Sequence, residues 1–173
     1  MYMKDRKVII RSAQLDDVNI LCNWWASGEV MAHAGFPNGL STDESKLVLR
    51  INEQNIDSLP ENQLIIIELE NDYPIGEMNY RKKLDGVFEI GIKICVLTEQ
   101  SKGYGTTAIK SLTAFLKNEM KANKIILDTN LKNIGAQKFY KKLGFKQTQI
   151  LKDCWTDQLG NLQGAVFFEM DLI

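Results

Sequence analysis

The segment from residue 87 to residue 96 restricts the possible folds of this chain more than any other. Its apolar residues alternate with small or charged ones, which places four apolar side chains on one face of an extended strand: Phe88, Ile90, Ile92 and Ile94. Pairs that favour tight turns precede this segment at residues 71–72 and 85–86. The pattern therefore predicts three consecutive strands, at 64–67, 75–81 and 87–96, joined by hairpins as antiparallel neighbours.

The N-terminal part of the chain predicts one strand and two helices. We expect a strand at 8–11, followed by a helix whose apolar positions recur at helical spacing: Leu15, Val18, Leu21, Cys22 and Trp25. Residues 26–40 carry three glycines and a proline and predict a loop. Ser41 and Glu44 then form the pattern of a capping box, which predicts the start of the second helix.

The C-terminal part alternates helices with strands. We expect a helix that ends near residue 121, a strand at 124–128, a helix from Asn133 to Leu143 that Gly144 terminates, and strands at 146–151 and 165–172. A strand, a helix and a strand in succession imply one parallel pair. The predicted fold class is α/β (α+β), with a mixed, mostly antiparallel, twisted sheet of about six to seven strands and about four helices packed on it.

Composition indicates one ordinary globular domain that spans residues 1–173. The chain is 45% hydrophobic, its formal net charge is −1, and its three cysteines lie far apart, which excludes a CxxC metal or redox site and predicts a reducing, cytoplasmic location. It has no apolar run near the roughly 18 residues of a membrane span. Because the net charge is close to zero, nothing predicts binding to nucleic acid or a membrane, and any bound anion has to be held locally.

A glycine-bearing segment follows the alternating strand and leads into a helix. Gly103 and Gly105 leave the backbone free to curl and expose its amides. The first amides of the following helix lack intrahelical acceptors and lie at the positive end of the helix dipole, so they favour a phosphate. Two glycines at this spacing also fit an ordinary tight turn, and the segment matches neither a Walker loop nor a full GxGxxG fingerprint.

A second pattern follows the strand at 124–128. Asn133, Ala136, Phe139, Tyr140 and Leu143 recur at helical spacing and end in Gly144-Phe145. Taken alone, the aromatic pair fits a core position and Asn133 fits a helix cap.

Together the two segments resemble the GCN5-related N-acetyltransferase (GNAT) family. Gln100, Gly103 and Gly105 match the family's acetyl-coenzyme A loop, Gln/Arg-x-x-Gly-x-Gly/Ala, and residues 133–145 are similar to its second motif. The opening and closing segments look like the branch with ribosomal-protein N-terminal, polyamine and aminoglycoside acetyltransferases. The resemblance covers the C-terminal half in strict motif, and the order of elements agrees along the whole chain.

The resemblance implies a site for acetyl-coenzyme A. The pantetheine arm would pair with the end of the splayed strand, and the pyrophosphate would rest on the glycine segment. The implied coenzyme contacts are Ile94, Cys95, Val96, Gln100, Ser101, Lys102, Gly103, Tyr104, Gly105, Thr106, Asn133, Ala136, Phe139, Tyr140 and Lys142.

The resemblance also implies direct transfer of the acetyl group to a primary amine. Tyr140 occupies the family's general-acid position, and a backbone amide near Cys95 or Val96 would hold the oxyanion. Glu89 is the first candidate base and Glu77 the second. Glu89 also fits a solvent-facing residue paired with Lys93. Four residues are candidate contacts of the acceptor: Trp24, His33, Phe36 and Glu77.

Several alternatives stay open at this level. The acceptor is a protein N-terminus, a polyamine or an antibiotic amine, and a homodimer is possible. A different class of protein, a noncatalytic acyl-coenzyme A sensor or docking module, would keep the glycine segment but have no use for Tyr140.

Overall fold

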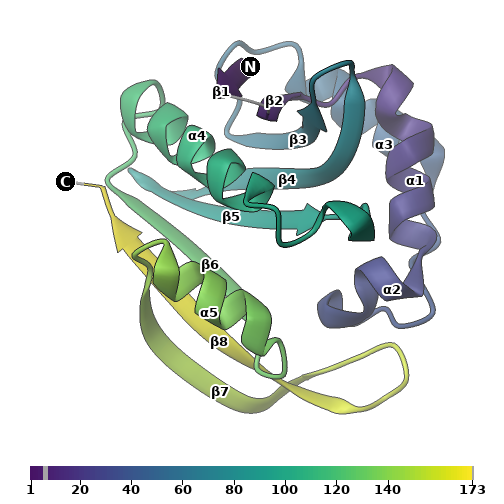
Figure 1. The fold of residues 1–173 in the computed structure, drawn as a ribbon, viewed down its shortest axis with the longest axis vertical. Coiled ribbons are helices and arrows are strands. Elements are labelled where there is room, and N and C mark those ends of the chain that lie inside the picture. Colours follow the sequence, from purple (N-terminus) through teal and green to yellow (C-terminus); the bar gives the residue numbers. More distant parts are fainter. Residues whose placement is uncertain (6–7, 173) are drawn as a thin grey trace.

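The computed structural model describes residues 1–5 and 8–172 and contains an eight-stranded sheet with the order β1-β2-β3-β4-β5-β6-β8-β7 (Figure 1). Its neighbours are antiparallel except for β5 and β6, which run parallel. The mixed, mostly antiparallel sheet is therefore confirmed, with one strand more than the upper predicted count. The strands are β1 (Tyr2–Asp5), β2 (Val8–Ser12), β3 (Asn62–Leu69), β4 (Tyr73–Leu84), β5 (Val87–Ile94), β6 (Lys124–Asn130), β7 (Lys146–Thr156) and β8 (Leu162–Asp171).

Strand β1 is the strand that the sequence patterns missed. It contains two charged residues in four and has no apolar run, so it carries no strand signal of its own. It pairs with β2 at the edge of the sheet, where Tyr2 lies opposite Arg11. Its strand conformation comes from this pairing.

Five α-helices occur in the described residues: α1 (Val18–Ala26), α2 (Gly28–Met31), α3 (Glu44–Gln54), α4 (Tyr104–Asn118) and α5 (Ile134–Lys142). The predicted loop at 26–40 is wrong in part, because it contains α2 and a 3-10 turn at Ala32–Ala34. The predicted capping box is also wrong: the carboxylate of Asp43 accepts from the amides of Ser45 and Lys46 at 3.0 and 3.3 Å and caps α3. None of the helices in 1–5 and 8–172 is long and apolar enough to cross a membrane.

Helices cover both faces of the sheet, and β3 shows how the two cores are separated. Ile65 and Ile67 face the core under α4 and α5, whereas Leu64 and Ile66 face the core under α1 and α3. Because β3 is buried on both faces, its continuous apolar run agrees with its position. The α1 stripe differs from the prediction: Trp24, rather than Trp25, is buried, because Val18, Leu21 and Trp24 share the inner face.

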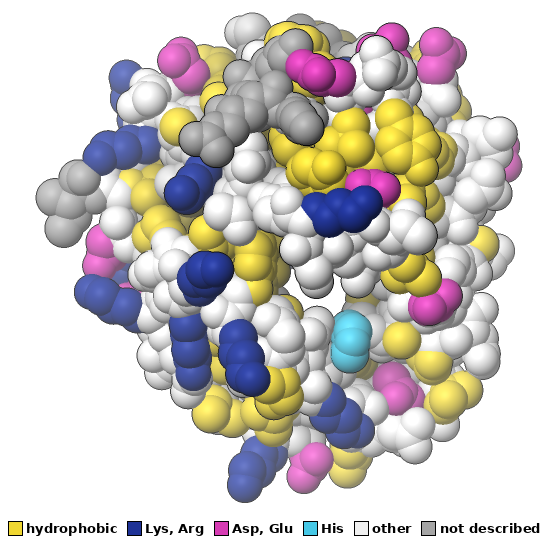
Figure 2. All heavy atoms as spheres, viewed as in Figure 1, with side chains coloured by type: hydrophobic (Ala, Val, Ile, Leu, Met, Phe, Trp, Pro, Cys, Tyr) yellow, Lys and Arg dark blue, Asp and Glu magenta, His cyan; other side chains and the backbone are white. Residues whose placement is uncertain are grey.

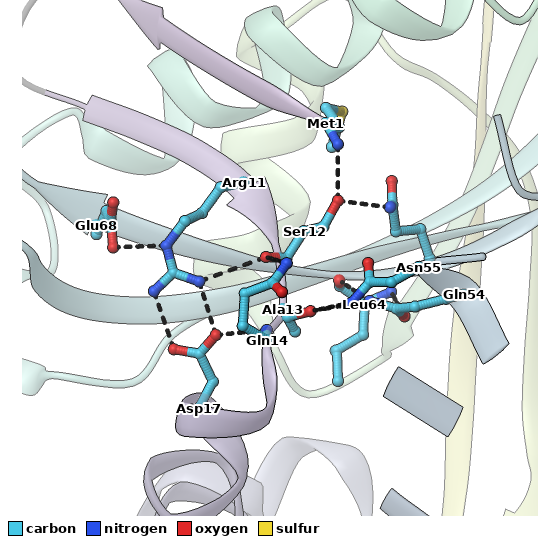
Figure 3. A network of polar contacts seen from close by, with 11 residues as sticks. Met1, Arg11, Ser12, Ala13, Gln14, Asp17, Gln54, Asn55, Leu64 and Glu68 are labelled. Atoms are coloured by element: carbon cyan, nitrogen blue, oxygen red, sulfur yellow. Dashed lines mark hydrogen bonds and ion pairs between the residues drawn. The ribbon is translucent and has the colours of Figure 1, made fainter. Parts of the chain in front are cut away.

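A polar network fixes the start of the chain against the central strands (Figure 3). Arg11 of β2 donates to both carboxylate oxygens of Asp17 at 2.6 and 2.9 Å and to the carboxylate of Glu68 at 2.9 Å. Both carboxylates are buried, so the guanidinium compensates charges that would otherwise be costly. This bidentate arrangement raises the pKa of Arg11 further and ties β2 to β3 and to the start of α1.

The parallel pair is short, and this shapes the rest of the molecule. Strands β5 and β6 pair only over Val87–Glu89 and Lys124–Ile126. Beyond these residues β5 continues to Ile94 and β6 to Asn130, and Figure 1 shows the two strands diverging. The sheet is therefore split between them, with backbone groups and side chains of both strands facing the opening.

Candidate active site

A cleft of about 730 Å³ opens where β5 and β6 separate. Segments far apart in the sequence line it, from α2 and the turn after it, β5, β6, α5 and β7. Figure 2 shows a hollow in this part of the molecule, beside the cyan histidine. A second cavity of about 940 Å³ lies between α3, β4 and β5. Gly91 and Asp128 line both cavities, so the two meet at the split in the sheet.

Gly103 is the residue at which the backbone turns into α4. It has φ +89°, a left-handed conformation, and a Cβ built on it would have no heavy atom within 4 Å. The first intrahelical bond runs from the amide of Thr107 to the carbonyl of Gly103 at 3.2 Å. The amides of Tyr104, Gly105 and Thr106 therefore precede the hydrogen-bonded turns and point out of the helix start. The geometry fits a phosphate in open space in front of these amides.

Gly105 has a different role from the one that the sequence suggested. A Cβ on it would lie 3.4 Å from Cζ of Phe139 and 3.8 Å from Cδ1 of Ile92. Its missing side chain lets α4 approach α5 and β5 closely, rather than clearing room for a ligand.

Gln100, the glutamine of the loop pattern, holds the end of β5. Gln100 Nε2 donates to the carbonyl oxygen of Ile94 at 2.9 Å. Lys102, which the resemblance places beside the pyrophosphate, is exposed and pairs with Glu99 at 3.0 Å. Ser101 has φ +61° and continues the tight curvature that ends at Gly103.

The amides of Cys95 and Val96 are already engaged. Both donate to the carbonyl of Ile75, at 2.8 and 3.0 Å, in the doubled pattern of a bulge. The predicted oxyanion donor near Cys95 or Val96 is therefore a neighbouring amide, not one of these two. Because backbone groups alternate between the two edges of a strand, Ile94 presents its amide and carbonyl to the cleft instead. The thiol of Cys95 is buried, which raises its pKa to about 12 and makes it a structural cysteine.

The start of α5 contributes to the same cleft. Asn133 caps the helix, with its Oδ1 accepting from the amide of Ala136 at 3.1 Å, and both residues line the cleft. Phe139 packs against α4 at Gly105. Lys142 is exposed in the last turn of α5.

Tyr140 is buried and also lines the cleft. Its ring lies among Phe139, Phe145 and Phe168, with ring centroids 5.4 to 5.8 Å away, which fixes its orientation. Burial, together with the charge of Asp128, raises the pKa of Tyr140 to about 12. Its hydroxyl therefore carries its proton at neutral pH.

Glu89 lies at the second cavity but is neutralised by two cations. Arg81 donates to its carboxylate through Nη2 and, at 3.1 Å, through Nε, and Lys83 lies 3.5 Å from it. Burial alone would raise the pKa of Glu89, but these partners outweigh it and lower the pKa. The alternative pairing of Glu89 with Lys93 is wrong, because Lys93 pairs with Glu77 on β4 at 3.0 Å.

Asp128 is the carboxylate that sequence reasoning missed. It follows the buried Leu127 on β6 and faces the split, where it lines both cavities. Its side chain is exposed to solvent in the open cleft, but partial desolvation there and the charge of Glu89 still raise its pKa. A carboxylate with a raised pKa takes up a proton more readily, whereas the pKa of Glu89 is lowered by its two cationic partners. We therefore favour Asp128 over Glu89 as the base. One feature of the sequence could have drawn attention to Asp128: it is one of only two acids in residues 100–152.

The predicted acceptor contacts are only partly brought together. His33 is exposed and lines the cleft, whereas Trp24 packs in the core under α1 and neither it nor Phe36 lines either cavity. Trp155, from the β7–β8 hairpin, lines the cleft and packs on Gly35, where a Cβ would lie 2.6 Å from its ring.

The tip of the same hairpin is tied to the segment after α2. The amide of Gln158 donates to the carbonyl of Gly35 at 2.8 Å, and its side chain bonds the backbone of Asn38 and Gly39 at 2.9 and 3.0 Å. These contacts join residues about 120 positions apart. They hold the hairpin that carries Trp155 against the segment after α2, a contact that no local sequence pattern indicates.

The two sides of the cleft carry opposite charge, although the net charge is near zero. Residues 100–152 contain eleven lysines and two acids, whereas residues 1–99 contain sixteen acids and ten basic residues. In Figure 2 the dark-blue side chains gather on the side of the hollow where α4 and α5 lie. An anion is therefore favoured on the side of α4 and α5.

Comparison with known proteins shows the family to which this chain belongs. A family model described as the acetyltransferase (GNAT) domain matches residues 7–146. An N-alpha-acetyltransferase of Saccharolobus solfataricus is 34% identical over 67 residues, which cover 38% of this chain and 40% of that protein. The match thus spans less than half of that relative.

Solved structures match almost the whole chain. The spermidine N-acetyltransferase of Vibrio cholerae, in complex with CoA and spermine, has a TM-score of 0.83 at 17% identity and covers 96% of both chains. An acetyltransferase of Salmonella typhimurium that modifies the N-terminal serine of ribosomal protein L7/L12 has a TM-score of 0.79 at 10% identity and covers 98% of this chain and 97% of that one. At these identities the likeness shows the fold alone.

Proposed function

This chain belongs to the GNAT acetyltransferase family and is an acetyl-coenzyme A-dependent acyltransferase, and we propose that it transfers the acetyl group directly to a primary amine at the split between β5 and β6. The observation that carries the proposal is the meeting of a proton donor and a proton acceptor at this split. Tyr140 and Asp128 line the same cleft. Burial and the charge of Asp128 raise the pKa of Tyr140, and desolvation and the charge of Glu89 raise the pKa of Asp128.

The coenzyme is held from the side of α4 and α5. The amides that precede the turns of α4 bind the pyrophosphate in front of Gly103, and the backbone of Ile94 pairs with the pantetheine arm as an added strand. The surplus of lysines on this side favours a polyanion. When bound, acetyl-coenzyme A supplies the thioester carbonyl that the amine attacks.

Asp128 takes the proton that the acceptor ammonium must lose before it can attack. A carboxylate with a raised pKa is suited to this step, because its pKa lies closer to that of the ammonium that loses the proton. Gly91 lines both cavities at their meeting point, and the side chain of Asn79 packs 3.0 Å from the place where its Cβ would lie.

Tyr140 assists departure of the sulfur. As the carbon–nitrogen bond forms and the carbon–sulfur bond breaks, its O–H donates a hydrogen bond to the sulfur, whose conjugate acid has a pKa of about 8.5 for an ordinary thiol. The phenol, with its higher pKa, stabilises the departing thiolate, which then takes up the proton that the amine nitrogen loses as the amide forms.

The proposal is tested by thiol release with a panel of amines. We expect free thiol only when acetyl-coenzyme A and a primary amine are both present, and an N-acetylated product whose mass is that of the amine plus one acetyl group. Thiol release at the same rate without an amine would contradict direct transfer. One domain for residues 1–173, a homodimer and a cytoplasmic location stay predictions from the sequence.

A further inference from the structure

Lys93 lies at the acceptor side of the cleft. The acceptor amine itself arrives as a cation, so a lysine at this place calls for an explanation. Lys93 is on β5, directly opposite Glu77 in the register of β4 and β5. Its Nζ lies 3.0 Å from Oε1 of Glu77. The Glu77 side chain is 2% exposed and that of Lys93 is 31% exposed, so the ammonium is the member of the pair that faces solvent.

Only the lysine of this pair reaches the cleft. Lys93 lines the cavity of about 730 Å³, whereas Glu77 is among the lining residues of neither described cavity at the split. The carboxylate therefore lies behind the lysine and holds it in place. An ammonium has three N–H donors, and one is used by Glu77, which leaves two for a ligand.

The pair is costly as a purely structural device. A buried ion pair can often be replaced by apolar side chains without loss of stability, because desolvation offsets the attraction. The neighbours of Lys93 on the same face of β5, Gly91 and Cys95, are uncharged. Glu77 uses one of the three donors of this ammonium, and the contacts of the described residues give the other two no partner.

We propose that Lys93 recognises the acceptor by donating a hydrogen bond to an oxygen on the carbon next to the reacting amine. The acceptor is then an α-amine, the amino group of an amino-acid unit that is either free or at the N-terminus of a peptide. This inference rests on the proposed function. Asp128 on β6 and Lys93 on β5 line the cleft from opposite sides of the split. An α-amine offers an ammonium to Asp128 and an adjacent oxygen to Lys93.

Charge supports the same class of acceptor. A diamine that placed its second ammonium near Lys93 would meet a like charge, which is unfavourable in a partly desolvated cleft. An α-amine has a pKa of about 8, against about 10.4 for a lysine side chain, so more of it is neutral at pH 7. Less help from a base is then needed for attack.

The experiment compares two acceptors that differ by one group. Leucinamide and 3-methylbutylamine carry the same branched chain, but only leucinamide has a carbonyl oxygen next to the amine-bearing carbon. We expect the wild-type protein to favour leucinamide by about 10- to 100-fold in kcat/KM, corrected for the neutral fraction of each amine, because a hydrogen bond from a charged donor is strong. Leucine and a leucyl dipeptide, tested alongside, show whether the adjacent oxygen is best supplied by a free carboxylate or a peptide.

A double variant removes the Lys93 ammonium without leaving the buried Glu77 carboxylate unpaired. In Lys93→Gln combined with Glu77→Gln the preference falls to within about threefold, while the coenzyme still raises Tm as in the wild type. Lys83→Gln, which removes a lysine outside both cavities, is the matched control and keeps the full preference. Should the double variant not fold, Lys93→Met tests the same loss of the ammonium in a single substitution.

Two results overturn the inference: equal use of the two amines by the wild type, or a preference that survives loss of the ammonium. Loss of activity toward both amines by the same factor in a folded variant also overturns it, because Lys93 then does not discriminate. Failure of the proposed function looks different. No amine is then acetylated by the wild type, whatever its neighbouring group.

Discussion

The two sides of the cleft are built in different ways. The coenzyme side comes from two continuous segments, residues 100–106 and 133–142, each of which leads directly into a helix. The acceptor side is assembled from α2, α3, β4, β5, β6 and the β7–β8 hairpin. The first side is basic and the second is rich in acids. A local motif can thus specify where a polyanion binds, whereas the acceptor site depends on how distant segments meet.

The largest expected effect is on the acceptor side, at Asp128. In Asp128→Asn the carboxamide cannot take a proton, so we expect kcat/KM for the amine to fall by about 100- to 10,000-fold. The Kd of coenzyme A should stay within about twofold of the wild type, since Asp128 is on the far side of the split. Glu89→Gln is the matched control, because its carboxylate is already paired with Arg81 and Lys83. A larger loss in Glu89→Gln than in Asp128→Asn would reverse the assignment of the base.

Tyr140 lies at the junction of the two sides and should show the next largest effect. Tyr140→Phe keeps the ring among its aromatic neighbours but removes the donor to sulfur, so thiol release should slow by about 10- to 100-fold with coenzyme binding retained. Unchanged turnover would remove Tyr140 from the mechanism.

The pH dependence separates Tyr140 from Asp128. Because burial raises the pKa of Tyr140 to about 12, the protonated form persists and kcat/KM should not decline before about pH 10, where an ordinary phenol titrates. On the acid side, protonation of Asp128 removes the base, and its raised pKa moves this loss to higher pH than for an ordinary carboxyl. The acid limb should therefore disappear in Asp128→Asn, and a basic limb near pH 8 that vanishes in Tyr140→Phe would contradict the raised pKa.

The coenzyme side is tested at Gly103. Gly103→Ala places a side chain in the open space before α4, and we expect the Kd of coenzyme A to rise about tenfold, the equivalent of about 1.4 kcal/mol. The left-handed backbone also adds strain of about 1 kcal/mol. Gly160→Ala controls for that strain, because Gly160 has φ +81° and equally open surroundings in the distant β7–β8 hairpin. If both variants lose stability but bind the coenzyme alike, the phosphate lies elsewhere.

The smallest effect belongs to the exposed lysines. Lys142→Gln should raise the Kd of coenzyme A by about two- to fivefold at low salt, as expected for an exposed charge pair. Lys141→Gln is the neighbouring control on α5, and both are exposed. Equal effects in the two variants would indicate that the basic side attracts the coenzyme through its general field, without a specific contact of Lys142.

The same contrast explains what the sequence could predict. The strong alternation of β5, the turns before it and the helical spacing after Asn133 are local patterns, and the structure confirms these elements. Strand β1 and helix α2 were missed because they are four residues long and acquire their conformation from neighbours. The cap of α3 was placed two residues early because Asp43 competes with Ser41 for the role.

At the site, spacing in the sequence indicated the residues of the coenzyme side but not their partners. Tyr140 and Gly103 follow from motifs; Tyr140 lines the cleft and Gly103 is the residue at which α4 begins. Glu89 was a reasonable base on strand alternation alone, but its pairing with Arg81 and Lys83 arises from the register of β4 and β5. Asp128 and Trp155 carry no local motif. Their place in the cleft depends on where β6 leaves β5 and where the β7–β8 hairpin meets the segment after α2.

The central claim is that the coenzyme and the acceptor meet at the split between β5 and β6. A crystal structure with coenzyme A bound tests it most directly. The account predicts the pyrophosphate within hydrogen-bond distance of the amides at 103–106 and the sulfur beside the Tyr140 hydroxyl, with open passage to Asp128. A pyrophosphate bound away from the start of α4, or a sulfur that lies next to neither Tyr140 nor Asp128, would contradict it.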